Sequence, residues 1–413
     1  MDFDWQRLSW RRDETGGESD ARIMVTSDWA PIRAGGPLIL ADPEGVYGRL
    51  LPELRRADLR IVNLECALGD AGTPIYKAGP NLEGGPDAIG GLTAPGFHVA
   101  CLGNNHTFDF GPERFRQMTD LLAQHSIRTV GAGLSETAAW QPLVATAGDA
   151  RIGIVNFCEG EDLTAAQGDA PGVCGWDVER AIANVRELRG RADVVLVICH
   201  AGREHTPLPP PYVVAAYRRI AEAGADAIVA HHPHVPQGIE VHRGVPIVYS
   251  MGNFLFYERG ERFYQKVGYM TELGLSGRRL SGLRLIPYRQ TAEGLTLIKG
   301  ELLTWLAGRL RRVSELLADD GAVRDAWHAF IEVRSEAGFE ALLAWALKSF
   351  EDNPPLGAAR VRNLFVTQAH RHLWTDGLTR IVEGAWGTAP AWACDLVREW
   401  TTLTVEQGLA CPA

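Results

Sequence analysis

The chain has 413 residues, of which 46% are hydrophobic and 22% are charged, and this composition excludes disordered and fibrous proteins. Acidic residues outnumber basic residues by 51 to 41, and the resulting net charge of −10 argues against a nucleic-acid partner. The seven cysteines form no CxxC pair, and no apolar run reaches the ~18 residues of a membrane span. We therefore expect reduced thiols, no membrane partner and a cytoplasmic location.

Residues 1–20 are polar and acidic and lack the apolar core of a secretory signal, so we expect a flexible leader. Short β-branched runs then predict buried strands at 23–26, 59–62, 98–102, 152–155, 194–198, 227–229 and 247–249. Apolar residues at helical spacing predict helices at 112–125, 178–188 and 212–223. This alternation predicts an α/β sandwich in which much of the sheet is covered on both faces.

The pattern changes after about residue 265. Segment 270–303 alternates apolar and polar residues with period two, which predicts antiparallel strands that close the sheet. Segments 301–350 and 356–410 have helical periodicity, and the second contains Trp374, Trp386, Trp392 and Trp400. We therefore expect a leader (1–20), an α/β domain (21–300) and a helical C-terminal extension (301–413). The tryptophans fit either the core of the extension or an aromatic groove for a peptide.

Polar side chains directly follow five of the predicted strands. Ligands of open α/β sheets bind beyond the carboxyl ends of the strands, so we expect these side chains to gather at one rim. Pro233 is expected to keep His232 extended, which would let neighbouring imidazoles converge. Six side chains at this rim are candidate metal ligands: Asp28, Glu65, Asn105, His200, His232 and His234.

Carboxylate, amide and imidazole donors without cysteine suit divalent ions such as Mn, Zn, Fe or Mg. Six donors exceed what a protein usually gives to one ion. A carboxylate that bridges two ions ~3.5–4 Å apart would use all of them. The sequence therefore predicts divalent metal ions, with two as the expected number and the element left open.

Six motifs occur in the order D…NLE…GNNHTFDFG…HAGRE…HHPHVPQGIE…YSMGNF over residues 22–260. This series resembles the CapA family of poly-γ-glutamate capsule proteins, a branch of the calcineurin-like metallophosphoesterase superfamily. The resemblance implies a four-layer α/β/β/α sandwich with a two-metal centre. It also implies roles for individual residues: Asp28 and Glu65 as metal carboxylates, one of them bridging, Asn105, His200, His232 and His234 as further ligands, His106 as the catalytic histidine and Asp109 as the group that orients it.

Two positions depart from the superfamily pattern. Ala30 stands where the first motif commonly has a histidine, and Glu65 stands where aspartate is usual. CapA-like proteins share both departures, which argue against ordinary phosphatase activity. Many CapA-like proteins are exported or anchored. In its length, expected location and helical extension, this chain instead resembles the lasso-peptide epimerases of the branch.

Three functions remain open from the sequence. The first is a metal-dependent epimerase that inverts an α-carbon, expected to be that of the C-terminal Trp of a lasso precursor peptide, by acid/base proton exchange. The alternative is a metallophosphoesterase, or a hydrolase or ligase of polyglutamate-related amide bonds. The third is a binding protein with a degraded metal site. A precursor peptide is the expected partner of the epimerase, and the oligomeric state stays open.

Proton exchange at an α-carbon requires carriers on both of its faces. His106 is expected on one face, with Glu204 or His205 on the other.

Three further residues are candidates for substrate binding. Arg203 is either a bidentate clamp for a substrate carboxylate or a surface arginine. Lys77 lies in a loop that is expected to border the pocket. Asn253 either lines the metal rim or caps a turn.

Overall fold

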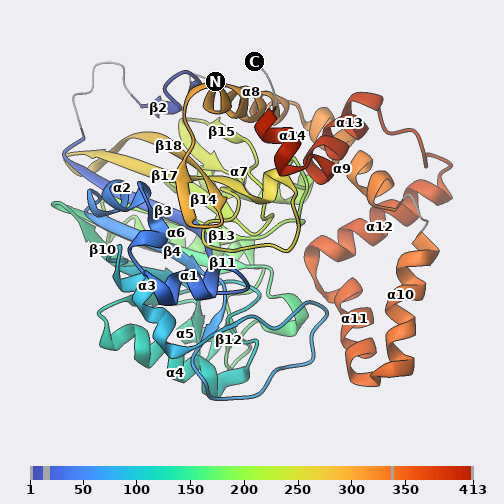
Figure 1. Cartoon of the computed structure of the whole chain (residues 1–413), viewed down its shortest axis with the longest axis horizontal. Helices are drawn as coiled ribbons and strands as arrows, with labels where there is room; N and C mark the ends of the chain where they lie inside the picture. Colours follow the sequence, from blue (N-terminus) through green and yellow to red (C-terminus); the bar gives the residue numbers. More distant parts are fainter. Residues whose placement is uncertain (1–2, 13–18, 336–338, 411–413) are drawn as a thin grey trace.

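The computed structural model describes residues 3–12, 19–335 and 339–410. Two β-sheets pack face to face, and helices cover the outer face of each sheet (Figure 1). The layers therefore follow the order α/β/β/α, which confirms the sandwich that the resemblance implies. The helical segment 339–382 lies beside the sandwich, on the right in Figure 1.

The first sheet has nine strands. Its order is β1 (Phe3–Asp4), β2 (Ser9–Arg11), β18 (Arg279–Thr291), β17 (Val267–Ser276), β3 (Ala21–Trp29), β4 (Leu59–Leu64), β7 (Val99–Cys101) and β8 (Arg128–Val130), and β19 (Gly294–Leu297) pairs with β18. Strands β3, β4, β7 and β8 are parallel, whereas β17 pairs antiparallel with both β3 and β18. The antiparallel strands expected after residue 270 are therefore confirmed.

The second sheet has six strands, in the order β10 (Leu143–Ala147), β11 (Ala150–Cys158), β13 (Val194–His200), β14 (Ala227–His231), β16 (Val245–Val248) and β15 (Ile239–His242). Its four central strands are parallel and both edge strands are antiparallel. Two strand pairs complete the described strands: β5 (Ala67–Leu68) with β6 (Glu83–Gly84), and β9 (Ala132–Gly133) with β12 (Gly172–Val173).

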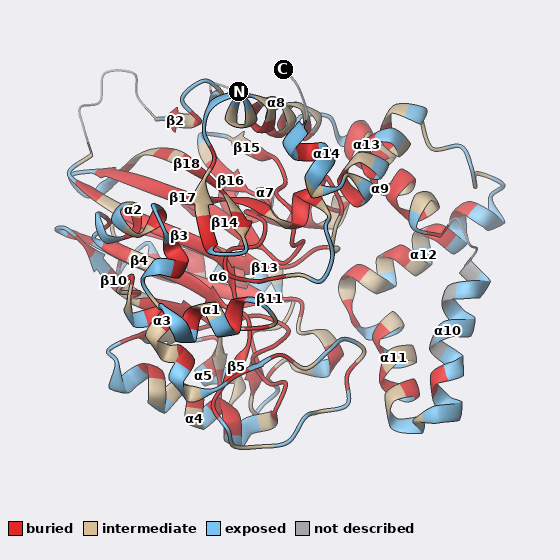
Figure 2. Cartoon of the chain, viewed as in Figure 1, coloured by how far each residue is buried: buried red, intermediate tan, exposed pale blue. Residues whose placement is uncertain are grey.

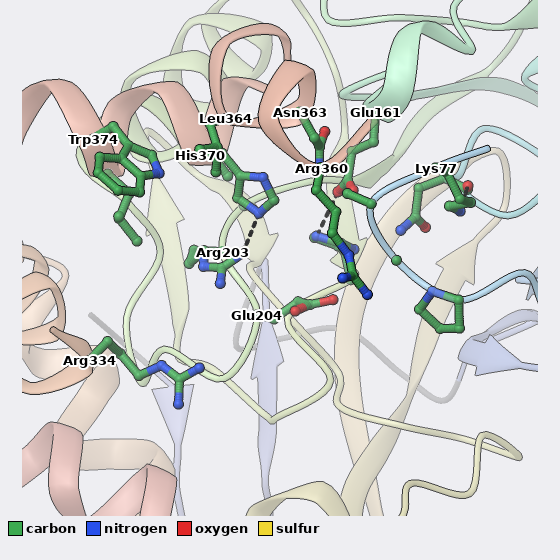
Figure 3. Close-up of a pocket in the computed structure, with 18 of the residues that line it drawn as sticks. Lys77, Glu161, Arg203, Glu204, Arg334, Arg360, Asn363, Leu364, His370 and Trp374 are labelled. Atoms are coloured by element: carbon green, nitrogen blue, oxygen red, sulfur yellow. Dashed lines mark hydrogen bonds and ion pairs between the residues drawn. The ribbon is translucent and has the colours of Figure 1, made fainter. Parts of the chain in front are cut away.

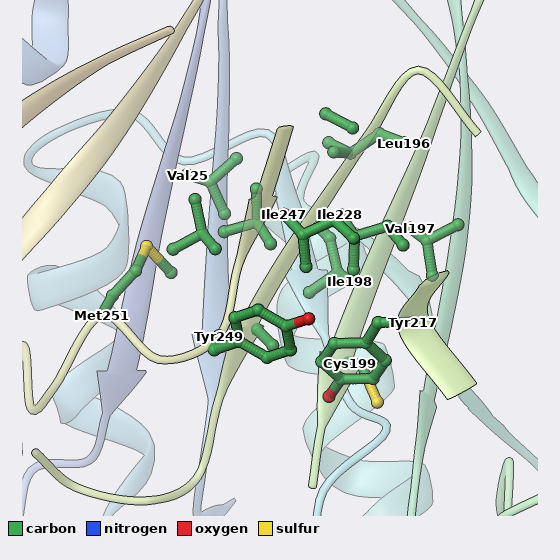
Figure 4. Packing of buried hydrophobic residues seen from close by; sticks show 14 of the residues in the cluster. Val25, Leu196, Val197, Ile198, Cys199, Tyr217, Ile228, Ile247, Tyr249 and Met251 are labelled. Atoms are coloured by element: carbon green, nitrogen blue, oxygen red, sulfur yellow. The ribbon is translucent and has the colours of Figure 1, made fainter. Parts of the chain in front are cut away.

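Alternating side chains of the first sheet enter two different cores. Ile23 and Val25 face the second sheet, whereas Met24 faces the outer helices. This division explains why the strands read as continuous apolar runs. Figure 4 shows the packing around Val25, Ile228 and Ile247, where aliphatic side chains of both sheets interdigitate.

The helices of the sandwich fall into two groups. Beside the first sheet lie α1 (Gly35–Ala41), α2 (Leu50–Arg55), α3 (Ile89–Thr93) and α4 (Gly111–Gln124). The second sheet is covered by α6 (Val178–Leu188), α7 (Pro211–Glu222) and α8 (Gly300–Leu316), and the short α5 (Glu136–Ala139) lies near β9 and β12. The three helices predicted at 112–125, 178–188 and 212–223 are confirmed as α4, α6 and α7.

The rest of the chain is helical, as its periodicity predicts. The helices are α9 (Asp320–Arg334), α10 (Phe339–Asp352), α11 (Pro354–Val366), α12 (Gln368–Val382), α13 (Ala391–Thr402) and α14 (Val405–Ala410). We call α10, α11 and α12 the cap. The cap exposes much more of its surface than the sandwich does (Figure 2). Across the described ranges, no helix combines the length and apolar character that a membrane crossing requires.

The expected flexible leader is wrong for residues 3–12. Strands β1 and β2 form a hairpin, and β2 pairs with β18 at the edge of the first sheet. Phe3, Leu8 and Trp10 are buried against the inter-sheet core. The polar composition hid this hairpin because its few apolar residues alternate with exposed polar ones. Residues 13–18 lie outside the described residues.

Trp400 of α13 offers a test of how the C-terminal helices are held. Its indole is 1% exposed, stacks on Tyr264 with 4.0 Å between ring centroids and donates a hydrogen bond to the Pro236 carbonyl at 3.2 Å. We expect Trp400→Ala to lower the free energy of unfolding by about 3–5 kcal/mol, measured by urea denaturation. Val382→Ala, at a side chain that is 87% exposed, should change it by less than about 0.5 kcal/mol. A Trp400→Ala variant as stable as the wild type would contradict this packing.

Candidate metal centre

The predicted ligands meet where strands of both sheets end. Asp28 and Glu65 come from the first sheet and the loop after it, and His200 ends β13 of the second sheet. The Asn63 amide links them, because its nitrogen donates to Asp28 Oδ1 at 2.9 Å and lies 3.3 Å from His200 Nδ1. The expected single rim is therefore a junction between two sheets. The sequence pattern alone could not assign the strands to separate sheets.

Two groups of three side chains each bring one potential ligand atom per residue within 4.8 Å of one another. The first group is Asp28, His200 and His231, and the second is Glu65, His232 and His234. His200 also lies 3.4 Å from Glu65 Oε1, and His234 lies 3.4 Å from Asp28 Oδ2, so the two groups are contiguous. The six residues form what we call the ligand cluster.

Asn105 lies at the edge of this cluster, with its Oδ1 3.0 Å from His200 Nε2. His231 was not among the predicted ligands. The His231-His232-Pro233-His234 run contained the signal, but the family pattern led only to the second and third histidines. His231 is the last residue of β14, and its Nδ1 lies 2.9 Å from His200 Nδ1.

The chemistry of the cluster fits divalent metal ions. Asp28 Oδ2, both carboxylate oxygens of Glu65 and His231 Nε2 are buried without a hydrogen-bond partner among the described residues. Unpaired buried carboxylate oxygens are costly unless a cation neutralises them. These four atoms are the donor types that Mn, Fe and Zn accept.

The backbone at the histidine run is not extended, which corrects the expectation for His232. His232 and His234 have φ values of 105° and 57°, both in the region that side-chain-bearing residues rarely adopt. Such strain often marks functional sites. Here it accompanies the placement of both imidazoles in one group of the ligand cluster.

The two carboxylates titrate in opposite directions. Burial raises the pKa of Asp28, but the close contact with His234 and the charges of His231 and His234 outweigh it, so the pKa lies below its usual value. Burial and the neighbouring Asp28 charge raise the pKa of Glu65 well above its usual value. Burial lowers the pKa of His234, but Glu65 and Asp28 reverse the effect and raise it well above 6.5. A protonated His234 thus supplies the positive charge that a metal ion would otherwise provide.

The other imidazoles of the cluster are neutral. Burial is the largest cause in each case, and it lowers the pKa of His231 to about 4 and that of His232 to about 3. Burial and the neighbouring histidines lower the pKa of His200 well below its usual value. Neutral imidazole is the form that binds metal ions.

Beside the ligand cluster, His106 belongs to a buried network. Its Nδ1 lies 2.6 Å from Asp109 Oδ2, and Lys77 Nζ donates to Asp109 Oδ1 and to the Asn105 carbonyl, both at 2.7 Å. Burial and the Lys77 charge lower the pKa of His106, so its imidazole is neutral near pH 7. Lys77 is a predicted substrate-binding residue, and its side chain borders the cavity described next. Its amine also contacts both members of the Asp109–His106 pair.

A cavity of about 270 Å³ opens beside the cluster (Figure 3). Asn105, His106, Glu204 and His232 form its sandwich side, and the wall opposite comes from α9 and the cap. The residues of that wall include Arg334, Trp345, Arg360, Leu364, His370, Leu373 and Trp374. Arg203 also lines the cavity and donates to His370 Nε2 at 2.5 Å.

The acidic side chains of the cavity differ in charge. Burial raises the pKa of Glu204, but Arg203, His205 and other imidazoles outweigh it and hold the pKa below its usual value, so Glu204 is ionised. Burial and the Glu204 charge raise the pKa of Glu161 to about 8. Glu161 also lines the cavity and lies 3.3 Å from His232 Nε2.

His205 and Asn253, two further predicted site residues, also lie outside the cavity wall. His205 contacts Gln265 at 2.7 Å through its Nε2, and burial lowers its pKa to about 4. Asn253 is fully buried, with its Oδ1 2.8 Å from His234 Nδ1. Asn253 therefore contacts the ligand cluster through His234.

Glu159 joins the cap to the sandwich. Its buried carboxylate accepts hydrogen bonds from the Gly202 and Ala369 amides at 3.0 and 2.9 Å and from the Tyr212 hydroxyl. Ala369 lies in the first turn of α12, where a negative charge is favourable. Tyr212 also stacks on His372 of α12 with 4.5 Å between ring centroids. Sequence reasoning missed Glu159 and the cap residues of the cavity, because no local pattern shows which distant helix covers a strand end.

The sandwich and its ligand cluster are compatible with a protein that binds divalent metal ions at the ends of its strands. The sequence profile of the bacterial capsule synthesis protein PGA_cap matches residues 14–258, more than half of the chain. The chain belongs to this family, which confirms the resemblance noted from its motifs.

Curated relatives agree with this assignment. The PGA biosynthesis protein CapA of Bacillus subtilis (strain 168) is 32% identical over 185 residues, 43% of this chain and 47% of the relative. The "Probable polyglutamine synthesis accessory protein MT0602" of Mycobacterium tuberculosis is 29% identical over 277 residues, 62% of this chain and 72% of the relative. The chain spans less than half of the B. subtilis protein. Among solved structures, a 5'-nucleotidase precursor from Thermus thermophilus aligns with a TM-score of 0.40 and 15% identity, covering 72% of this chain and 59% of that one.

Loss of one ligand should weaken metal binding measurably. We expect Glu65→Ala and His231→Ala each to lower Mn²⁺ affinity at least ~10-fold, because each removes a side chain that the ligand cluster uses directly. Isothermal titration with Mn²⁺ and elemental analysis after dialysis would measure the loss. His242→Ala, at a histidine that pairs with Glu222 away from the cluster, should keep wild-type affinity. Unchanged Mn²⁺ affinity of the His231→Ala variant would show that His231 does not bind the metal ion.

Proposed function

We propose that the protein is a metal-dependent enzyme that inverts an α-carbon of a peptide substrate by acid/base proton exchange. The observation that carries this proposal is the shared cavity of His106 and Glu204. His106 follows β7 of the first sheet and Glu204 follows β13 of the second, and both side chains line the same cavity beside the ligand cluster. Inversion at one carbon requires two proton carriers that can reach it, and these two side chains come from different sheets.

The protonation states of His106 and Glu204 determine how protons would move during the reaction. Asp109 at Nδ1 of His106 favours a proton on that nitrogen and leaves Nε2 as a proton acceptor. The α-carbon–hydrogen bond breaks as its proton passes to one carrier, and the other carrier delivers a proton to the opposite face. Because His106 is neutral and Glu204 is ionised, both begin as acceptors. The carrier that delivers a proton must therefore first take it from solvent.

The ligand cluster and the cationic cavity wall would both stabilise the negative charge that develops on the substrate. Divalent ions held by the cluster would supply Lewis-acid stabilisation of charge on a substrate carbonyl or carboxylate. Arg203 and Arg334 line the same cavity and would hold a carboxylate of the substrate. Trp374, Leu364 and Leu373 give the wall an apolar part that fits an aromatic side chain such as that of a C-terminal Trp.

A second function is favoured by the relatives. Their names concern capsule and polyglutamate synthesis, and by analogy this chain would cleave or form polyglutamate-related amide bonds, or hydrolyse a phosphoester. A bound metal ion would then activate water instead of stabilising a carbanion. Arg203 and Arg334 would bind glutamate carboxylates equally well.

Solvent labelling separates the two functions. A synthetic peptide with a C-terminal Trp and a free carboxylate would be incubated with Mn²⁺-loaded protein in D₂O. We expect one deuterium at the α-carbon of Trp and formation of its D-isomer without cleavage, measured by mass spectrometry and chiral chromatography. His106→Ala should slow both at least ~100-fold because a proton carrier is lost. His125→Ala, at an exposed histidine, should not.

A γ-linked glutamate oligomer and p-nitrophenyl phosphate would be tested in parallel. Cleavage of either without deuterium uptake by the peptide would contradict the epimerase and support the second function.

A further inference from the structure

A second cleft, between α10 and α11, adjoins the cavity beside the ligand cluster. This cleft measures about 200 Å³ and is lined by Trp345, Lys348, Ser349, Asp352, Asn353, Leu356 and Arg360. Trp345 and Arg360 line both spaces, so they form the boundary between cavity and cleft. Figure 3 shows Arg360 extending from α11 into the cavity.

The cleft follows from the spacing of residues on the two helices. Trp345, Lys348 and Asp352 recur at intervals of three and four residues on α10, and Leu356 and Arg360 are four residues apart on α11. Gly357 lets the two helices approach closely, because a Cβ at this position would lie 2.6 Å from the Phe350 amide nitrogen. The helices therefore pack tightly at one level and leave the cleft open beside it.

Arg360 is held at the boundary with an unused donor. Its guanidinium carbon lies 4.4 Å from the centroid of the Trp345 ring, and its Nη1 donates to Ser349 Oγ at 2.5 Å. Its Nε is buried and has no partner among the described residues. An N–H group in this state favours an acceptor such as a peptide carbonyl.

Because the cavity is small, part of a longer substrate must lie outside it. At about 270 Å³ it lies below the ~300–1,000 Å³ of sites that enclose whole small molecules. A peptide whose reacting residue lies beside His106 must therefore continue elsewhere. The Trp345 indole, which is 57% exposed, offers a stacking surface on the route into the cleft.

We propose that the cleft between α10 and α11 is a second subsite, which binds the residues of an α-peptide substrate next to the reacting residue. Arg360 Nε donates to a main-chain carbonyl and Trp345 packs against the neighbouring side chain. Lys348 and Asp352 give the cleft both charges, which suits polar peptide flanks more than a uniformly anionic polymer. This inference rests on the proposed function only in taking the substrate to be a peptide.

Binding of a peptide series to the Mn²⁺-loaded full chain tests the subsite. The probes are N-acetylated peptides of one, three and five residues that end in Trp with a free carboxylate, with alanine at the other positions. We expect the Kd from isothermal titration to fall about 10-fold from one residue to three, or about 1.4 kcal/mol. Leu356→Trp, which fills the cleft, should abolish this gain and leave the Kd of the one-residue probe unchanged.

A second cleft variant and a matched control distinguish loss of the subsite from misfolding. Lys348→Trp narrows the cleft from the exposed face of α10 and should also abolish the gain. Leu347→Trp, at the adjacent position that lines neither space, should retain it. A wild-type Kd that does not depend on length, or a gain that survives in both cleft variants, would overturn the subsite alone. Failure of every α-peptide to bind while γ-linked glutamate oligomers do would overturn the subsite and the proposed function together.

Discussion

Three buried carboxylate oxygens, one on Asp28 and two on Glu65, have no hydrogen-bond partner among the described residues. Uncompensated charge in a protein interior costs several kcal/mol, so this arrangement persists only if a cation is close. Protonated His234 lies 3.4 Å from Asp28 Oδ2 and 3.6 Å from Glu65 Oε1, and Glu65 favours its neutral form. Divalent ions would release the proton of His234 and let Glu65 ionise as well. Two of the chain's acidic residues, Asp28 and Glu65, thus lie where they can bind cations.

The rest of the molecule follows from this requirement. The ligands come from two sheets, so the sandwich must close for the cluster to form, and the strained backbone at His232 and His234 completes it. Glu159 then ties Gly202, next to the Arg203–Glu204 pair, to the first turn of α12. Through that link the cap forms the far wall of the cavity. The strand ends that carry the ligand cluster are therefore covered by the cap. The ligand cluster and the opposite wall of the cavity therefore come from different parts of the chain.

Much of the sandwich could be predicted from the sequence because its strands are buried on both faces and read as short β-branched runs. The six predicted ligands follow these strands and meet as expected. Other features depend on long-range packing and leave no local signal. The partition of the strands between two sheets, the β1–β2 hairpin and the pairing of Lys77 with Asp109 are of this kind. His231 is different. It belongs to the same run of histidines as His232 and His234, but the family pattern assigns only those two as ligands.

We propose that the ligand cluster forms one two-metal centre across both sheets. A crystal structure of the Mn²⁺-loaded protein with anomalous scattering measured at the manganese edge tests it most directly. Two anomalous peaks ~3.5–4 Å apart are predicted, one beside Asp28, His200 and His231 and the other beside Glu65, His232 and His234. No peak within the cluster, or peaks only at exposed carboxylates elsewhere, would contradict it.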